Sequence, residues 1–276
     1  MAATLKEIVA SARRRVFDAR PAADLRELER HAEEHAPRGF RTALQNAALK
    51  GDVAIIAELK KASPSRGVIR EDFRPAQLAS DLAQAGAVAL SVLTDFEYFQ
   101  GSLEYLRTAS ESCALPCLRK DFIVDEFQLL EAKAYRADAV LLIVAALSQA
   151  ELVGLVMQSR NYGLDVLCEA HDETELQRAL DAGCNLVGIN SRNLHTFQVD
   201  LETAFRLAPR IPHDVVSVAE SGIGTGADVA RLRTAGYKAF LIGESLMKAE
   251  RPGEALSTLL EEAVRAIPAE PGVSSR

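Results

Sequence analysis

The sequence has little of what marks a membrane protein or a nucleic-acid-binding protein. No stretch approaches the roughly 20 consecutive apolar residues that a membrane-spanning helix needs. Basic residues are not in excess, because 32 Lys and Arg stand against 39 Asp and Glu, for a formal net charge of -7. Proteins that bind nucleic acid usually have a basic face. We therefore expect neither a membrane nor a nucleic acid as a partner.

Cysteine is also scarce. The four residues, Cys113, Cys117, Cys168 and Cys184, are scattered through apolar segments. Only Cys113 and Cys117 lie close together, and their spacing is not that of a CxxC redox motif or a zinc site. We expect all four to be free, buried thiols in a reducing compartment. The N-terminus does not have the residue order of a signal peptide, so a cytoplasmic protein is predicted.

The chain is long enough for one large α/β domain. It has 276 residues, of which 48% are hydrophobic and 26% charged, as in an ordinary protein with a sizeable core. Residues 4–20 have the apolar spacing of an amphipathic helix, a second charged helix follows, and the pattern changes at residue 53. We expect a single domain over residues 1–276, with a helical extension over 1–50, a main body over 51–266 and a disordered tail over 267–276.

Eight short apolar runs, rich in Val, Ile, Leu and Ala, alternate with amphipathic segments from residue 53 onward. Continuous apolar runs of this length are typical of parallel strands buried on both faces. Some of the amphipathic segments begin with helix-capping residues, at Asp125, Ser148 and Asp172, and several end in glycine. This alternation predicts a (β/α)₈ TIM barrel with the first 50 residues outside it. An open doubly wound sheet is the alternative, but no strand is followed by the GxGxxG turn of that fold.

Polar residues interrupt the apolar runs at the carboxyl ends of several expected strands. In a TIM barrel these ends converge on the active site. Charged groups are costly to bury there unless they interact with each other or with a ligand. The set combines lysines, glutamates and an asparagine, which indicates acid–base chemistry rather than a metal cage or a nucleophile triad. Its members are Glu58, Lys60, Lys120, Asp121, Glu169, Asn190, Arg192 and Glu220.

Two parts of this pattern have a less specific interpretation. Glu58 and Lys60 lie two residues apart and face the same side of their strand, so they could form a structural salt bridge across the barrel mouth. His171 and His195 fall just past strand ends, and we expect no direct chemical role for either.

Glycine-bearing turns follow the last two expected strands, in the segments AESGIGT and LIGES. Barrels of this type often bind phosphate with the loops after strands seven and eight. Glycine lets backbone N–H groups approach the phosphate oxygens, and the Ser221 hydroxyl can add a hydrogen bond. The alternative is that Gly222, Gly224 and Gly243 serve only tight turns. Because both turns stand at the expected positions, we predict a phosphate site.

Six segments closely resemble those that mark indole-3-glycerol phosphate synthases, and they occur in the same order. They are IIAELKKASPSRG, SVLTDFEYFQGS, LRKDFIVDEFQ, GINSRNL, AESGI and LIGESLM. Other phosphate-binding barrels share the glycine-rich end but not ELKKASPS or LRKDF. This family also carries an extra helical segment ahead of the first strand, which helps to close the site and fits the extension. The resemblance implies the monofunctional form, with no isomerase barrel fused to it.

The resemblance further implies a carboxy-lyase of tryptophan biosynthesis. Its substrate would be 1-(2-carboxyphenylamino)-1-deoxyribulose 5-phosphate, which is converted to indole-3-glycerol phosphate by ring closure with loss of CO₂ and water. Lys120 would be the general acid that protonates the ribulose carbonyl as the ring carbon attacks. Glu169 would assist the later proton removal and dehydration. The residue types agree with this chemistry, because ring closure onto a ketone needs a proton donor at the developing alkoxide.

Supporting roles for the other candidates are also implied by the resemblance. Lys60 would contact charged and hydroxyl groups of the substrate, Glu58 and Glu220 would orient the lysines and the sugar hydroxyls, and Asn190 would hold the substrate or Glu169. Arg192 would pair with the anthranilate carboxylate. The residues expected at the phosphate end are Ser63, Ser221, Gly222, Gly243 and Glu244, the last through its backbone N–H. Those expected to form an apolar bed for the aromatic ring are Pro64, Phe99 and Phe122.

Neither ring closure nor decarboxylation calls for a metal or a cofactor, and none is expected. The expected partner is a small phosphorylated molecule, and the expected state is a monomer or a weak homodimer. Two other functions stay open. Another phosphosugar barrel enzyme would need different residues: a Cys/Asp pair for phosphoribosylanthranilate isomerase, or a His/Asp metal set for a ribulose-phosphate epimerase. A barrel that binds a phosphometabolite or partner without catalysis would have no reason to keep the costly charges of Lys60, Lys120 and Glu169.

Overall fold

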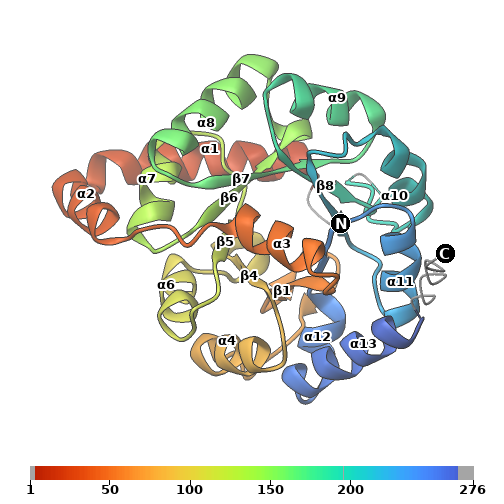
Figure 1. Cartoon of the computed structure of the whole chain (residues 1–276). Helices are drawn as coiled ribbons and strands as arrows, with labels where there is room; N and C mark the ends of the chain where they lie inside the picture. Colours follow the sequence, from red (N-terminus) through yellow and green to blue (C-terminus); the bar gives the residue numbers. More distant parts are fainter. Residues whose placement is uncertain (1–3, 195, 267–276) are drawn as a thin grey trace.

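Eight parallel strands close into a barrel surrounded by helices, which confirms the predicted (β/α)₈ fold and excludes the open sheet (Figure 1). The computed structural model describes residues 4–194 and 196–266. The strands follow one another around the barrel in chain order from β1 through β4 to β10, which pairs with β1 again. Their bounds are β1 Ala54–Leu59, β4 Ala89–Leu93, β5 Cys117–Lys120, β6 Ala139–Ile143, β7 Asp165–Ala170, β8 Leu186–Asn190, β9 Val216–Glu220 and β10 Ala239–Ile242. Each strand lies within one of the eight apolar runs.

Helices cover the outside of this barrel. The α-helices that follow the strands are α4 Pro75–Gln84, α5 Phe96–Phe99, α6 Leu103–Glu111, α7 Phe127–Ala134, α8 Gln149–Asn161, α9 Glu173–Asp181, α10 Glu202–Leu207, α11 Gly226–Thr234, α12 Glu244–Lys248 and α13 Pro252–Ala266. Two short 3₁₀ helices are η1 Val144–Ala146 and η2 Ala208–Arg210. No helix in the described segments is long and apolar enough to cross a membrane.

Two of the three predicted helix starts are confirmed. Ser148 caps α8 in a capping box with Glu151, and Asp172 caps α9. The start predicted at Asp125 is displaced, because α7 begins at Phe127 with Glu126 at the N-cap position. The Asp125 side chain still accepts a hydrogen bond from the backbone N–H of Phe127, so its capping group reaches the helix from one residue further out.

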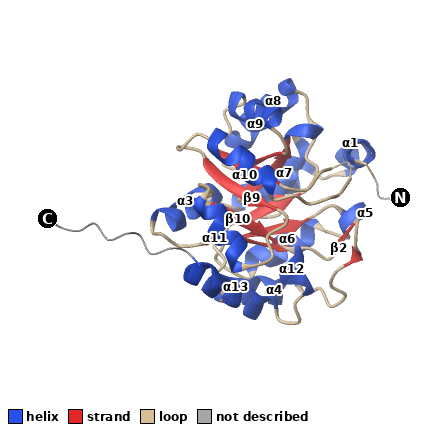
Figure 2. Ribbon diagram, turned by 90° about the vertical axis from the view of Figure 1, so that its right-hand side faces the viewer, coloured by secondary structure: helices blue, strands red, loops and turns tan. Residues whose placement is uncertain are grey.

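The apolar side chains form two layers, inside and outside the barrel. The outer layer lies between strands and helices, and the inner layer fills the barrel with residues such as Ile56, Leu118 and Leu167. Helix α3 (Phe40–Leu49) contributes Phe40 and Leu44 to the inner layer, both fully buried. It lies across one end of the barrel and closes it (Figures 1 and 2). Burial of aromatic and aliphatic side chains is a main source of stability in folded proteins.

The N-terminal extension lies on both ends of the barrel. The predicted helix over residues 4–20 is α1 Leu5–Ala22, and the charged segment after it is α2 Leu25–Glu34. Figure 2 shows α1 on the side of α5 and β2, opposite to α3. The chain therefore crosses from the carboxyl ends of the strands to their amino ends before β1 begins.

The segment after β1, Ser63 to Gly67, has more regular structure than a flexible loop rich in Gly, Pro and Ser would have. Its ends form a small antiparallel hairpin of β2 (Ala62–Ser63) and β3 (Gly67–Val68). Gly67 has a φ of 68° and carries no side chain that would resist this left-handed conformation. The expected disordered tail, residues 267–276, and His195 lie outside the described residues.

The prediction of four free thiols is wrong for two of them. Cys168 and Cys184 form a disulfide, whereas Cys113 and Cys117 are free. Cys168 lies on β7 among the outer-layer residues, and Cys184 follows α9 on the way to β8. One strand–helix unit therefore brings the two Cα atoms within 6.5 Å, a proximity that their separation of 16 residues does not reveal.

Candidate active site

Strand geometry explains how one end of the barrel collects charged side chains. Alternate residues of a strand face the same side, so a residue two places after an inner-layer residue also faces the barrel interior. Glu58 follows Ile56 in this way, Lys120 follows Leu118, and Glu169 follows Leu167. Asn190 and Glu220 continue the pattern on β8 and β9, where they stand opposite each other in the strand register. The interior is apolar below and charged at the carboxyl ends.

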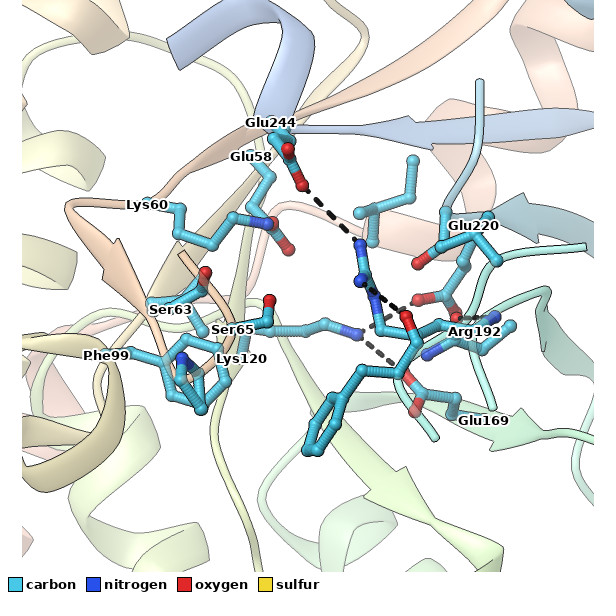
Figure 3. A pocket seen from close by; sticks show the side chains of 18 of the residues that line it. Glu58, Lys60, Ser63, Ser65, Phe99, Lys120, Glu169, Arg192, Glu220 and Glu244 are labelled. Atoms are coloured by element: carbon cyan, nitrogen blue, oxygen red, sulfur yellow. Dashed lines mark hydrogen bonds and ion pairs between the residues drawn. The ribbon is translucent and has the colours of Figure 1, made fainter. Parts of the chain in front are cut away.

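These strand ends open into a cavity of about 650 Å³. Every residue proposed from the sequence as a catalytic or binding candidate lines it, and Figure 3 shows the charged side chains converging on its centre. The size is suitable for a small ligand. No group of three or more His, Cys, Asp or Glu side chains in the described part of the chain is arranged to hold a metal ion.

Lys120 lies at the centre of the charged cluster. Its Nζ donates to Glu169 Oε2 at 2.6 Å and to Glu220 Oε2 at 3.0 Å. Its side chain is only 12% exposed, and the two carboxylate side chains are 3% and 2% exposed. The three groups come from β5, β7 and β9, so closure of the barrel alone brings them together.

The electrostatics of this cluster separate the two carboxyl groups. Burial disfavours the ammonium of Lys120, but Glu169 and Glu220 reverse that effect and raise its pKa. Burial opposes ionisation of Glu169 too, yet its pKa is lowered well below the usual value by Lys120 and then by His171. For Glu220 burial prevails, and with repulsion from Glu169 it raises the pKa to about 8. At neutral pH the ammonium therefore faces one charged and one protonated carboxyl group.

A second lysine–glutamate pair lies in the same cavity. Lys60 Nζ donates to Glu58 Oε1 at 2.5 Å, and the two side chains are 14% and 5% exposed. Both groups line the same cavity as Lys120 (Figure 3). The salt bridge considered from the sequence is therefore present, but it lies within the cavity wall.

Two glycines make room for these carboxylates, and sequence reasoning missed one of them. A Cβ at Gly188 would lie 1.9 Å from Glu220 Oε1, and a Cβ at Gly243 would lie 2.5 Å from Glu58 Oε1. The sequence places Gly188 within an apolar strand but does not show that it lies beside Glu220, because that neighbour depends on the strand register. A side chain at either position would collide with the neighbouring carboxylate, so both positions require glycine.

The predicted phosphate end lies at the turns after β9 and β10. Ser221 and Gly222 both have left-handed backbone, with φ of 64° and 80°, so their turn is sharply bent. After β10, Gly243 stands at the N-cap of α12, and Glu244 is the first residue of that helix. All four residues line the cavity, together with Ser63 from the hairpin. The Ser63 hydroxyl is buried without a hydrogen-bond partner in the described structure.

Arg192 lies closer to the phosphate end than its expected role implies. Its guanidinium approaches Glu244 Oε2 at 3.5 Å and donates to the backbone carbonyl of Phe197 at 3.3 Å. Arg66, from the hairpin, approaches the other Glu244 oxygen at 3.4 Å. The sequence did not single out Arg66, because a lone arginine in a loop is usually solvated. One carboxylate thus holds two arginines at the cavity wall.

The apolar wall combines the barrel with the N-terminal extension. Phe99 from α5 and Phe122 after β5 stack at a tilt, with 6.3 Å between ring centroids. Leu5 and Ile8 of α1 also line the cavity. The sequence predicted the apolar face of this helix but not its target, because periodicity does not tell which surface a helix covers. Apolar side chains on this wall are suited to an aromatic ring.

Hydrogen bonds hold α1 in this position. Ser11 donates to Glu97, and Arg15 pairs with the buried carboxylate of Asp95 at 2.5 Å. Asp121, expected at the rim, is buried beside them and accepts from Thr94 at 2.6 Å. The extension is therefore anchored to the segment after β4 that carries Phe99.

Known proteins resemble this chain over most of its length. A family model described as indole-3-glycerol phosphate synthase matches residues 5–259. The chain belongs to the indole-3-glycerol phosphate synthase family. A curated indole-3-glycerol phosphate synthase of Koribacter versatilis is 55% identical over 260 residues, which cover 94% of this chain and all of that protein. One of Acidithiobacillus ferrooxidans is 49% identical over 256 residues, covering 92% and 97%.

Membership in this family confirms the resemblance found in the sequence motifs, and with it the expected carboxy-lyase of tryptophan biosynthesis. Solved structures outside the family share only the fold. Thiamine phosphate pyrophosphorylase from Pyrococcus furiosus aligns with a TM-score of 0.58 at 15% identity, covering 80% of this chain and all of the other. KGPDC from Streptococcus mutans aligns with a TM-score of 0.60 at 10% identity, covering 78% and 98%.

Proposed function

We propose that this chain converts 1-(2-carboxyphenylamino)-1-deoxyribulose 5-phosphate to indole-3-glycerol phosphate with Lys120 as the general acid. The observation that carries the assignment of Lys120 is its ammonium, which is buried at the cavity centre between two carboxyl groups. The ring carbon that bears the carboxylate attacks the ribulose carbonyl, and Lys120 gives its proton to the oxygen as the new carbon–carbon bond forms. A positioned donor of this kind contributes about 10²–10⁴-fold to a rate.

Loss of CO₂ and water completes the reaction. The carbon–carboxylate bond breaks, and its electrons return to the ring. Departure of the hydroxyl group and of a proton then gives the indole. Glu169 is assigned to this proton removal, because it is ionised, buried and within hydrogen-bond distance of Lys120. An apolar pocket favours the loss of CO₂, because it holds the ring but solvates the leaving carboxylate poorly.

The remaining residues bind and orient the substrate. Lys60 contacts its charged and hydroxyl groups, and Glu58 holds Lys60. Glu220 and Asn190 stand opposite each other on β9 and β8, from which they can orient the sugar hydroxyls and Glu169. Arg192 pairs with the anthranilate carboxylate after exchanging its contact with Glu244.

The phosphate and the aromatic ring are assigned to opposite walls. The phosphate lies against the turns after β9 and β10, where Ser221, Gly222, Gly243 and Glu244 offer backbone N–H groups and a hydroxyl, with Ser63 opposite. The ring lies against the apolar wall of Pro64, Phe99 and Phe122.

The direct test is to mix the protein with synthetic substrate and record indole fluorescence. We expect fluorescence to rise with time in the absence of added metal or cofactor. A protein that binds the substrate, measured by calorimetry, but produces no indole would contradict the proposal and support a binding barrel instead.

A further inference from the structure

His171 lies directly behind the charged cluster, and none of the roles above uses it. It follows the last residue of β7 and begins the turn into α9. Its side chain is 13% exposed, and it does not line the cavity. The ring lies between two carboxylates: Nδ1 is 2.9 Å from Glu175 Oε2, and Nε2 is 3.4 Å from Glu169 Oε1. His171 therefore reaches the reaction only through Glu169.

The start of α9 sets the orientation of this ring. One oxygen of Glu175, Oε2, accepts both the backbone N–H of His171 at 2.8 Å and its ring Nδ1–H at 2.9 Å. The backbone N–H of Glu175 in turn donates to the N-cap Asp172 at 2.8 Å. The imidazole is thus fixed at its outer nitrogen. Its inner nitrogen, Nε2, is buried without a hydrogen bond in the described structure and faces Glu169.

An imidazolium at this place needs both carboxylates. Burial disfavours the charge, and so does the positive end of the helix dipole at the start of α9. Glu169 and Glu175 outweigh the burial and raise the pKa of His171 to about 10. His171 is therefore a cation at neutral pH, and Glu169 has a cation at each oxygen, Lys120 at Oε2 and His171 at Oε1.

The other charged groups around the pair do not duplicate this contact. Glu220, from β9, is a carboxyl group that contacts Lys120, and Glu58 acts on Lys120 from β1, so neither adds a positive charge beside Glu169. On α9, Arg178 is turned away and donates to the carbonyls of Val144 and Leu147. Apart from Lys120, the imidazolium is the cation closest to Glu169 among the described residues.

We propose that His171 is a positioning residue that keeps the carboxylate of Glu169 oriented and ionised. This inference rests on the proposed function and deepens it. When Lys120 gives its proton to the substrate oxygen, Glu169 loses the charge of its first partner. His171 is not in contact with the substrate and keeps its own charge at that moment. Glu169 is then still an anion when the later proton has to be removed.

The test compares His171→Asn with substitutions of two glutamates on α9, Glu175 and Glu173. We expect His171→Asn to lower kcat about tenfold on the acidic limb of its pH profile, with KM within about twofold, because Glu169 is less often ionised there. Loss of a nearby cation raises the pKa of a carboxyl group, so the acidic limb of the kcat profile moves up by about one pH unit. Activity therefore recovers as the pH rises. Glu175→Gln shifts the limb in the same direction but less, and the exposed Glu173→Gln leaves it unchanged.

An NMR titration reads the charge of His171 without substrate. The imidazole signal of His171 is assigned by its loss in His171→Asn. We expect its chemical shift to be that of a protonated ring at about pH 8, where an ordinary histidine is neutral. Glu169→Gln lowers this pKa.

The outcomes separate the inference from the function. Wild-type protein that does not turn over the substrate refutes the proposed function. Normal turnover together with an unshifted pH profile in His171→Asn overturns only the inference, as does a rise in KM with kcat unchanged. If His171→Asn does not fold, Glu175→Gln decides, and an unshifted profile in that variant overturns the inference.

Discussion

The two ends of the barrel bury charges in different ways. At the amino ends of the strands, Asp138 precedes β6, and its carboxylate accepts hydrogen bonds from Arg38 and from the backbone N–H of Cys117, with His35 at 3.4 Å. No side-chain atom of this group is buried without a partner in the described structure. At the carboxyl ends, buried polar atoms of two residues that line the cavity, Ser63 and Glu220, have no hydrogen bond in the described structure.

This difference distinguishes stability from function. A fully hydrogen-bonded buried charge has nothing left to offer a ligand, and removing one member leaves the others unpaired. A cluster with unsatisfied atoms carries a free-energy cost that a substrate can relieve. The structure therefore predicts opposite results for substitutions at the two ends.

The largest effect is expected at the amino end. Asp138→Ala leaves Arg38 and His35 without their carboxylate and should destabilise the protein by about 3–5 kcal/mol. Urea unfolding measures this change, and kcat per folded molecule should stay at the wild-type value. The exposed Glu254→Ala, which breaks a surface pair with Arg251, should leave the free energy of unfolding close to the wild-type value. Loss of kcat without loss of stability in Asp138→Ala would break the comparison.

The pKa of Asp138 adds a pH dependence to this end. Burial disfavours its charge, but hydrogen bonds from His35 and Arg38 lower its pKa below the usual value. A lowered pKa contributes stability above the pKa of the unfolded carboxyl group, and this contribution is lost as the pH falls through the folded pKa. Wild type should therefore lose its stability advantage over Asp138→Asn in acid.

A smaller free-energy effect, but a loss of activity, is expected at the carboxyl end. Lys120→Ala should lower kcat by at least about 100-fold, because the proton donor at the carbonyl is removed. Circular dichroism and the unfolding midpoint should show an intact fold. Lys133→Ala, on the outer helix α7, is the matched control and should retain full activity. Near wild-type turnover by Lys120→Ala would exclude it as the general acid.

The smallest expected effect is on the pH dependence of kcat, and it concerns Glu220 at the carboxyl end. Above its pKa of about 8, Glu220 becomes charged. The added negative charge stabilises the ammonium form of Lys120, so Lys120 becomes a weaker acid. We expect kcat to fall a few-fold above about pH 8. Glu220→Gln cannot ionise and should lack this alkaline fall. An identical fall in both proteins would assign it to another group.

The sequence predicted the carboxyl end far better than the amino end. Strand-end charges such as Lys120 and Glu169 interrupt apolar runs, and the fold rule places all strand ends together. Asp138 stands in the turn before its strand, where an aspartate is common, and its partner Arg38 lies 100 residues away. Partners at that separation have no spacing signature.

Local pattern also could not reveal what tertiary packing decides. Helix α3 lies within the predicted helical extension over residues 1–50, but its position across the end of the barrel was not predicted, because periodicity does not show which surface a helix covers. The Cys168–Cys184 bond and the contact of His171 with Glu169 depend on how the turns around β7 and α9 fold back. In each case the residue type was visible and its neighbour was not.

Gly188 has a consequence for how tolerance to substitution should be interpreted. It has no positive φ, so its backbone does not require glycine; it is the space beside Glu220 that does. A mutational scan would find this position intolerant even to alanine, although it does not line the cavity, and strand propensity would not explain why. In variant libraries of this barrel, position 188 belongs with the active-site positions and not with the strand core.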